Sequence, residues 1–402
     1  MNQNKLRKNV LVIGQGYVGL PLALEIAKAK FQVTGLDINA DLILQLQNGV
    51  SPITGVTDNY LKSALKSGLF NLSSDIDRPF DFDIAIICVP TPLSTSKKPD
   101  LSYLISASKL IGKNLQNGNL VIVESTVAPG TTRRVVLPIL KEASSLSDDQ
   151  FLLSYSPERI DPLNSEWHLT NTPKIVSGFD PRSQEAVLEF YSKFIDNLVV
   201  AHSLESAEAS KLLENAFRLV NIAFINEFWD FCEETGLDIQ EVLELSKTKP
   251  YGYMPFYPSL GAGGHCIPVD PVYLLDCAQL VGVDIKILRA ASEINSASPL
   301  KILKKVKKNF PNLLGKKILL IGVAYKRNIS DTRDTPVKTL RDELESQGAW
   351  VFWHDNFVSN WLGESSVPIT ANYDLAILCT PHDDLELSAL GTTPLYDPRY
   401  SV

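Results

Sequence analysis

The stretch from Gly261 to Asp270, GAGGHCIPVD, concentrates residues that could carry covalent chemistry. Three glycines in four residues leave little side-chain bulk ahead of Cys266, so backbone amides can approach a ligand closely. The residues after Cys266 could open a helix, and a helix N-terminus lowers the pKa of a nearby thiol. Composition alone leaves open a buried structural cysteine. His265 is adjacent to Cys266, and adjacent side chains usually point apart, so we favour a structural or substrate-contact role for His265.

A second motif, Gly14-Gln15-Gly16-Tyr17-Val18-Gly19, matches GxGxxG between a short apolar run and a helix-length stretch. In that context the first glycine permits a tight turn, the second admits a pyrophosphate, and the third lets the helix pack on the sheet. Asp37 closes the next apolar run, where an acid can hydrogen-bond the adenosine ribose and repel a 2′-phosphate. The pattern therefore predicts an NAD site rather than an NADP site; a glycine-rich turn without a ligand is the alternative.

The composition excludes several classes of protein. The chain has 402 residues, of which 45% are hydrophobic and 21% are charged, and its formal net charge is −8. That length predicts two or three domains that bury enough apolar surface to fold without staples. An acidic chain repels nucleic-acid phosphates, so no nucleic-acid partner is expected.

Cysteine usage and hydropathy indicate the compartment. The five cysteines are scattered and lack CxxC spacing, so neither a disulfide framework nor a metal site is predicted. No apolar stretch reaches the roughly 18 residues that a membrane span needs, and the first apolar run is too short for a signal peptide. We expect a cytoplasmic protein with no membrane partner.

The order of apolar runs predicts an α/β fold. Buried parallel strands are expected at residues 10–13, 31–36, 83–89 and 120–123, with helices at 20–30 and 101–115 between them. Strands at 317–322, 350–353 and 374–379 restart the pattern, and YDLAILCTP near the C-terminus resembles FDIAIICVP at 82–90. The lysine-rich stretch 301–308 is amphipathic, which predicts a solvated helix face.

A long helix is predicted between these α/β segments, at residues 203–236. Its apolar positions fit one wide face: Leu212, Leu213, Ala216, Leu219, Val220 and Ala223. The fold expected is thus two Rossmann-like doubly wound domains joined by a central long-helix region. We place the NAD-binding domain at 1–200, a helical dimerisation domain at 201–300, and a second Rossmann-like domain at 301–402.

Ordered blocks along the whole chain resemble the UDP-glucose/GDP-mannose dehydrogenase family. The blocks are VIGQGYVGLPLA, VPTP, ESTVAPGTT, YSPERIDP, EASKLLENAFR, GAGGHCIPVDP and GVAYKRNISDTRDTP. The resemblance implies a four-electron oxidation of a sugar C6 hydroxyl to a carboxylate by two NAD⁺, with a UDP-sugar bound by the C-terminal domain. Cys266 would form first a thiohemiacetal and then a thioester, because covalent addition makes the aldehyde carbon tetrahedral before the second oxidation.

The same resemblance assigns further catalytic roles. Lys211 and Asn215, one helical turn apart, would stabilise the oxyanion at C6. Glu158 would assist hydrolysis of the thioester. Thr126 and Asp270 would position water and handle protons.

Binding residues follow from the same blocks. NAD contacts are implied at these residues: Gly14, Gly16, Tyr17, Val18, Gly19, Asp37, Val89, Pro90, Thr91, Ser125, Thr126 and Arg333. Substrate contacts are implied at these: Glu158, Arg159, Lys211, Asn215, Tyr257, Gly264, Tyr325 and Lys326. A lysine suits a diphosphate as a point charge.

The flanks of the cysteine loop resemble the UDP-N-acetylhexosamine branch of the family. UDP-glucose enzymes typically carry a lysine before the aspartate of this loop, where the chain has Val269. We expect UDP-N-acetylglucosamine, with UDP-N-acetylmannosamine, UDP-N-acetylgalactosamine and UDP-glucose as alternatives. Two departures bear on the fit of the sugar: PSLGAGGHC replaces the usual PGPGxGGHC, and Ile160 stands where this branch often has an acid.

Two other classes remain open at the level of sequence. A two-electron hydroxy-acid dehydrogenase would not need Cys266. A non-catalytic sugar-nucleotide sensor would not need the set of residues with catalytic roles. The resemblance also implies a homodimer built on the long helix and a place in capsule, lipopolysaccharide or related surface-polysaccharide biosynthesis.

Overall fold

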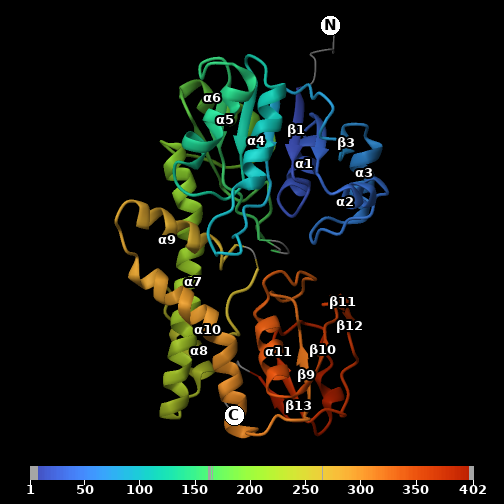
Figure 1. Ribbon diagram of the computed structural model, residues 1–402, viewed down its shortest axis with the longest axis vertical. Helices are drawn as coiled ribbons and strands as arrows, with labels where there is room; N and C mark the ends of the chain where they lie inside the picture. The colour runs from blue at the N-terminus through green and yellow to red at the C-terminus, as the bar shows by residue number, and fades with distance from the viewer. Residues whose placement is uncertain (1–7, 162–163, 165, 265, 398–402) are drawn as a thin grey trace. The chain divides into compact units, whose positions relative to one another are not determined.

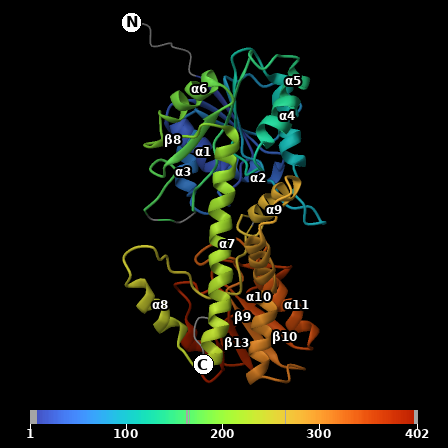
Figure 2. The same cartoon turned by 90° about the vertical axis from the view of Figure 1, so that its left-hand side faces the viewer.

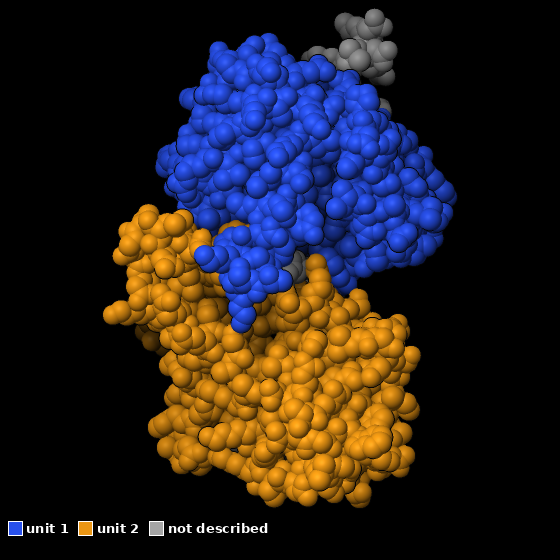
Figure 3. All heavy atoms as spheres, in the orientation of Figure 1, with its two compact units in different colours: residues 1–213 blue, residues 214–402 orange. Residues whose placement is uncertain are grey.

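The computed structural model describes residues 8–161, 164, 166–264 and 266–397. These form two compact units, unit 1 up to Leu213 and unit 2 from Glu214, which Figure 3 draws in different colours. Each unit is described by itself.

Unit 1 is built on an eight-stranded sheet with the order β3-β2-β1-β4-β5-β6-β7-β8. All neighbouring strands are parallel except β6 and β7, which pair antiparallel. The strands are β1 (Asn9–Ile13), β2 (Gln32–Leu36), β3 (Phe70–Ser73), β4 (Ile84–Ile87), β5 (Leu120–Val123), β6 (Leu152–Tyr155), β7 (Lys174–Gly178) and β8 (Leu198–Val200). The order reverses between β1 and β4, which is where open α/β sheets bind their ligands.

Alternation along the strands explains why helices cover both faces of this sheet. Val10 and Val12 of β1 belong to one apolar cluster, whereas Leu11 and Ile13 belong to another. Successive strand residues point to opposite faces, so a run of four apolar residues needs cover on both sides.

The helices of unit 1 supply that cover (Figure 1). Buried side chains of α1 (Gly19–Lys28), α2 (Ala40–Gln47), α3 (Asp58–Lys66) and α6 (Pro181–Tyr191) join the first cluster. Those of α4 (Ser102–Asn114), α5 (Leu137–Ser144) and the start of α7 join the second. A π-helical turn, Thr132–Val136, precedes α5.

Helix α7 (Leu204–Thr235) runs without a break for 32 residues, as Figure 2 shows. It begins in unit 1 and ends in unit 2. Of the apolar face predicted for it, Leu212, Ala216, Leu219 and Ala223 are buried. The prediction is wrong for Leu213, which is 65% exposed because it points away from the buried side of the helix.

Unit 2 contains a four-stranded parallel sheet with the order β10-β9-β13-β14. Its strands are β9 (Lys317–Ile321), β10 (Trp350–His354), β13 (Leu375–Leu378) and β14 (Leu395–Tyr396), and a separate pair is β11 (Asn360–Trp361) with β12 (Glu364–Ser365). This order repeats β2-β1-β4-β5 of unit 1. The resemblance between residues 82–90 and the C-terminal segment therefore reflects equivalent strands, β4 and β13.

The helices of unit 2 pack on the second sheet or on one another. They are α8 (Ile239–Lys247), α9 (Asp270–Leu280), α10 (Lys286–Asn309) and α11 (Pro336–Ser346), with a 3₁₀ turn at Leu387–Leu390. The lysine-rich face predicted as solvated is wrong for Lys305 on α10. Its ammonium pairs with Asp230 and Glu233 at 2.8 Å each and lies over the ring of Trp229.

The predicted fold class is confirmed. Both sheets and the central helix occur where the apolar pattern predicts them, to within a residue or two at most ends. The apolar pattern did not predict β3, β6, β7 and β8 in unit 1, β11, β12 and β14 in unit 2, or the antiparallel pairing of β6 with β7.

Candidate functional site

The turn between β1 and α1 has the geometry that GxGxxG predicts. Gly14 has φ +94°, its N–H donates to Leu36 O at 2.8 Å, and a Cβ there would lie 2.6 Å from Cys88 O. A Cβ at Gly19 would lie 1.8 Å from Gly14 O. Gly14 and Gly19 are therefore required by the packing of the protein's own backbone, whether or not a ligand binds.

Gly16 is different, because a Cβ there would meet nothing within 4 Å. Neither backbone strain nor packing within the described protein requires a glycine at this position. A pyrophosphate approaching the N-terminus of α1 does require one. The turn therefore fits NAD, with Tyr17 and Val18, both partly buried, beside it.

Asp37 follows β2 directly. Its Oδ2 accepts the N–H of Gln15 at 2.8 Å, and its Oδ1 accepts the N–H of Asn39 at 2.9 Å. The side chain is only partly buried. It is thus anchored to the glycine-rich turn while still presenting a carboxylate to solvent, as the hydrogen bonds to a ribose require.

The loops after β4 and β5 are hydrogen-bonded to each other. Ser125 Oγ donates to Val89 O at 2.7 Å, and Thr91 Oγ1 donates to Thr126 O at 2.7 Å. Pro90, between Val89 and Thr91, is exposed. Parallel strands bring their carboxyl ends to one edge, so these predicted NAD residues lie along the edge that also carries the glycine-rich turn.

Glu208 ties the loop after β5 to α7, a role that the sequence analysis did not identify. Its carboxylate is fully buried and accepts the N–H groups of Gly130 and Thr132. Lys211 lies three residues later on α7 and is also buried. The signal was present in EASKLLENAFR, whose first glutamate lies one helical turn before the lysine.

Glu158, after β6, lies where the positive charge of Lys211 acts on its carboxyl. Burial raises the pKa of Glu158, while the charge of Lys211 and the N–H of Ile160 act in the opposite direction without cancelling that effect. Arg159 points elsewhere and donates to Pro173 O at 2.8 Å. A carboxyl with a raised pKa is suited to proton transfer.

A second buried acid, Glu124, follows β5. Its Oε1 pairs with Lys174 Nζ at 3.0 Å and accepts the hydroxyl of Tyr191. The side chains of Glu124 and Lys174 are almost fully buried, and both charges act on Glu158. Sequence reasoning missed Lys174 and Tyr191, because they lie in β7 and at the end of α6, far from Glu124 in the chain.

The cysteine loop lies in unit 2, against the segment that follows β9. Gly264 has φ +79° and donates its N–H to Arg333 O at 3.2 Å. A Cβ at Gly264 would lie 2.8 Å from the ring of Tyr325, and a Cβ at Gly263 would lie 2.8 Å from Tyr325 Cβ. The two glycines are thus explained by the approach of Tyr325, while His265 lies outside the described residues.

Cys266 is partly buried, and its carbonyl accepts the N–H of Asp270 at 2.8 Å as α9 begins. Asn215 Nδ2 donates to Asp270 Oδ2 at 2.5 Å. Three of the residues predicted to be catalytic are therefore brought together in unit 2 by α7, the cysteine loop and the first turn of α9.

Two buried asparagines hold the rest of the cysteine loop, and sequence reasoning missed both. Asn295 of α10 accepts the N–H of Ala262 at 2.6 Å and donates to Ala262 O at 3.1 Å. Asn226 of α7 accepts the N–H of Ser259 at 2.9 Å. Since they lie inside long helices, no local motif marks them.

The remaining predicted substrate and cofactor residues of unit 2 differ in how far they are exposed. Arg333 pairs with Asp331 at 2.5 Å and keeps nearly half of its side chain exposed. Tyr325 and Lys326 are partly buried. Tyr257 is exposed, and its hydroxyl is a partner of Lys247 at the end of α8.

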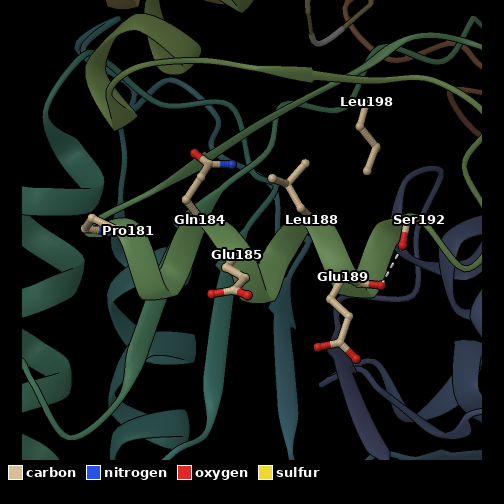
Figure 4. Close-up of a pocket in the computed structure, with 7 residues that line it drawn as sticks. All are labelled: Pro181, Gln184, Glu185, Leu188, Glu189, Ser192 and Leu198. Atoms are coloured by element: carbon tan, nitrogen blue, oxygen red, sulfur yellow. Dashed lines mark hydrogen bonds between the residues drawn. The ribbon is translucent and has the colours of Figure 1, made fainter.

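A shallow hollow in unit 1 lies beside α6, and Figure 4 shows the side chains along it. None of the predicted site residues lines it. Among the described residues, no group of three or more His, Cys, Asp or Glu side chains could hold a metal ion. Nor is any helix in the described part of the chain long and apolar enough to cross a membrane.

Three family models match the chain in order. The UDP-glucose/GDP-mannose dehydrogenase NAD-binding domain matches residues 8–195, the central domain of that family matches 205–297, and its UDP-binding domain matches 319–397.

Individual proteins match over nearly the whole length. A UDP-N-acetyl-D-glucosamine 6-dehydrogenase from Pseudomonas aeruginosa is 36% identical, with 97% of this chain and 96% of the relative covered. A UDP-N-acetyl-D-mannosamine dehydrogenase from Methanocaldococcus jannaschii is 33% identical, with 96% and 88% covered. A solved UDP-D-ManNAc dehydrogenase from Pyrococcus horikoshii aligns with TM-score 0.89 at 29% identity, covering 97% of this chain and 95% of that one. The chain belongs to the UDP-glucose/GDP-mannose dehydrogenase family and is an NAD-dependent UDP-sugar dehydrogenase.

Proposed function

We propose that the protein oxidises the C6 hydroxyl of UDP-N-acetylglucosamine to the uronic acid. The cysteine loop held beside Asp270 and Asn215 is the observation that carries the chemistry. The choice of sugar is supported by relatives named UDP-N-acetyl-D-glucosamine 6-dehydrogenase, at 36% identity in P. aeruginosa and 38% in Salmonella typhi. UDP-N-acetylmannosamine is the main alternative, since relatives of that name match at about the same coverage; UDP-N-acetylgalactosamine and UDP-glucose complete the set.

The proposed reaction balances as alcohol plus two NAD⁺ plus water giving carboxylate, two NADH and three protons. NAD⁺ supplies the hydride acceptor for each oxidation. Cys266 Sγ adds to the aldehyde carbon and forms a thiohemiacetal. Loss of the second hydride leaves a thioester, and water then cleaves the C–S bond and returns the thiol.

Charge on the C6 oxygen is stabilised by groups on α7. Lys211 supplies a positive charge that is buried and so weakly screened by water. Asn215 supplies an N–H donor that Asp270 orients from α9. Since both residues lie one turn apart on a single helix, their spacing along α7 is fixed.

Proton transfer is assigned to groups whose environment suits it. Burial raises the pKa of Glu158, so its carboxyl can take a proton from the water that attacks the thioester. Thr126 and Asp270 position that water and relay protons. Thr126 is held in place through its carbonyl by Thr91.

We propose that residues 1–200 bind NAD through the residues of the β1, β2, β4 and β5 loops, and that 301–402 bind the UDP-sugar. Tyr325, Lys326 and Gly264 would contact substrate, together with Glu158 and Arg159, and Arg333 would contact the pyrophosphate of NAD. Residues 201–300 form the central domain, with Tyr257 as a further substrate contact.

We further propose a cytoplasmic homodimer that supplies surface-polysaccharide synthesis. Its support lies in the exposed side of α7, where Leu213, Phe217, Phe224 and Phe231 are each at least half exposed. Large apolar side chains repeating along one helix are typical of a surface that a partner covers. Light scattering at micromolar concentration should give a dimer, and a monomer would refute this part.

The sugar is tested by incubating the protein with NAD⁺ and each of five nucleotide sugars. These are UDP-N-acetylglucosamine, UDP-N-acetylmannosamine, UDP-N-acetylgalactosamine, UDP-glucose and GDP-mannose. We expect the highest kcat/KM with UDP-N-acetylglucosamine and a uronic acid as the product identified by mass spectrometry. A higher kcat/KM for another UDP-sugar would replace the substrate but keep the reaction. Binding without NADH formation would indicate a sensor.

A further inference from the structure

A second aspartate closes a strand in unit 2 at the position equivalent to Asp37. Asp355 follows β10 and is 4% exposed. Its Oδ2 accepts the N–H groups of Val323 and Ala324 at 2.7 and 3.1 Å, and its Oδ1 accepts those of Phe357 and Val358 at 2.8 and 3.2 Å. Both oxygens are therefore occupied by the protein.

His382 completes this arrangement from the segment after β13. Its Nε2 lies 3.0 Å from Asp355 Oδ2, and both side chains are fully buried. Its Nδ1 accepts the N–H of Asn328 at 2.9 Å. Because Nδ1 accepts, the proton of the neutral imidazole is on Nε2 and is donated to Asp355. The ring of Phe357 packs on the imidazole with 4.9 Å between centroids.

The residues between Val323 and Asn328 are thus held at both ends. At the first end, Asp355 binds two N–H groups, and Thr380 Oγ1 donates to Ala324 O at 2.6 Å. At the other end, Asn328 has φ +60°, donates its Nδ2 to Asp383 Oδ2 at 2.6 Å and accepts the backbone N–H of Asp383 on its Oδ1 at 3.0 Å. Tyr325 and Lys326 lie between these two anchors.

We propose that Asp355 and His382 are positioning residues for substrate, which hold the segment 323–328 so that Tyr325 and Lys326 meet the UDP-sugar. Neither residue contacts the ligand in this account. The inference rests on the proposed function, because it takes Tyr325 and Lys326 as substrate contacts. It also excludes the role that the equivalence with Asp37 would suggest, since a ribose would have to displace four N–H groups and an imidazole from Asp355.

The test uses the full-length enzyme and compares three variants. His382→Phe keeps a ring but removes both hydrogen bonds. His382→Asn keeps an oxygen where Nδ1 lies and can still accept the N–H of Asn328. Asp374→Asn is the matched control: Asp374 precedes β13 and accepts the N–H of Lys317 at 2.8 Å and Lys316 Nζ at 2.9 Å, at the opposite end of the same sheet.

Steady-state rates are measured with UDP-N-acetylglucosamine and NAD⁺ varied in turn. We expect His382→Phe to raise the KM for the UDP-sugar about tenfold or more, with kcat and the KM for NAD⁺ changed less than about twofold. His382→Asn should recover most of the loss. Asp374→Asn should lower thermal stability without moving the KM for the UDP-sugar.

Thr380→Val provides a second variant should His382→Phe not fold. It removes only the bond to Ala324 O, and we expect a rise of about threefold in the KM for the UDP-sugar. An unchanged KM for the UDP-sugar in the folded His382 and Thr380 variants, or an equal rise for both substrates, would overturn the positioning role. Failure of the wild-type protein to bind UDP-N-acetylglucosamine or UDP in calorimetry would instead refute the proposed function.

Discussion

Asp37 and Asp355 occupy equivalent places in two sheets of the same strand order, yet their carboxylates are used differently. Each follows the strand next to the first strand of its sheet, and each accepts an N–H from the turn after that first strand. Asp37 stays partly exposed with two N–H partners. Asp355 is buried with four N–H partners and His382.

The number of internal partners decides what each acid can do. A carboxylate has about four favourable acceptor positions, so two N–H groups leave Asp37 capacity for a ribose, whereas Asp355 has none left. We therefore propose that Asp37 forms part of the cofactor site, whereas Asp355 holds the turn that carries Tyr325 and Lys326. Position in the fold indicates where a functional acid could lie, and satisfaction of its oxygens indicates whether it binds a ligand.

The largest loss of stability is expected when the first glycine of either turn is replaced by alanine. Gly14 and Gly322 have φ values of +94° and +81°, and a Cβ would lie 2.6 Å from Cys88 O and 2.1 Å from Thr380 O, respectively. Both combine a left-handed backbone with a clash against a carbonyl. Replacing Gly322 by Ala should cost about 4 kcal/mol or more, and replacing Gly14 somewhat less. Urea unfolding checks the order, and a larger cost at Gly14 would contradict it.

The next largest loss of stability is expected for Asp355→Asn, at about 3 kcal/mol. In asparagine an NH2 group replaces one of the two carboxylate oxygens. The backbone N–H groups that this oxygen accepted would then be buried without an acceptor. Asp37→Asn should cost less than about 1 kcal/mol because its side chain is partly exposed. Tryptophan fluorescence reports mainly on unit 2, where Trp229, Trp350, Trp353 and Trp361 lie, and Trp167 reports on unit 1. Equal losses in the two variants would remove the distinction between the acids.

The pH dependence of stability should have opposite signs in the two units. Burial raises the pKa of Asp355, but the hydrogen bonds from His382, Phe357 and Ala324 outweigh it, so the pKa lies below its ordinary value. Its stabilising contribution is present above about pH 4 and is lost as the pH falls through the lowered pKa.

Glu208 in unit 1 has only two N–H partners, and burial raises its pKa to about 7. Its contribution is complete below about pH 4.5 and is lost as the pH rises through 7, by about 3 kcal/mol at most. Hydrogen exchange at about pH 3 and pH 5 measures the change in unit 2, and at about pH 5 and pH 8 it measures the change in unit 1, which Glu208→Gln should abolish. A slope that persists in that variant would show that another group titrates.

The smallest effects on stability should accompany specific losses of NAD affinity. Gly16→Ala meets no protein atom within 4 Å, so the free energy of unfolding should change by less than about 1 kcal/mol. Its KM for NAD⁺ should nevertheless rise at least tenfold, because the methyl group occupies the approach of the pyrophosphate. Asp37→Ala should raise the same KM about tenfold through lost ribose hydrogen bonds. A KM for NAD⁺ that Gly16→Ala leaves unchanged would remove the pyrophosphate from this turn.

Much of this architecture could be predicted from the sequence, because it depends on local patterns. Apolar runs identified β1, β2, β9 and β10, and apolar positions repeating on one helical face identified α7. The strands that follow β5 in unit 1 carry weaker runs, so β6 to β8 and the antiparallel pairing of β6 with β7 were missed.

The site could be predicted only where chemistry is concentrated in a motif. Cys266, Asp270 and Asp37 lie in such motifs. Asn226, Asn295, Lys174 and His382 do not, since their partners lie 27 to 72 residues away and only folding brings them together. The pairing of Asp355 with His382 is of this kind. No spacing rule connects the end of β10 to the segment after β13.

The most direct test of the proposed reaction counts NADH formed for each UDP-N-acetylglucosamine consumed, in the wild-type enzyme and in Cys266→Ser. We expect two NADH per sugar in the wild type, because the aldehyde stays bound to Cys266 until the second oxidation. The variant should stall before the carboxylate, since a serine hydroxyl cannot form the thioester. One NADH per sugar in the wild type, or a stoichiometry and rate that Cys266→Ser leaves unchanged, would contradict the covalent mechanism.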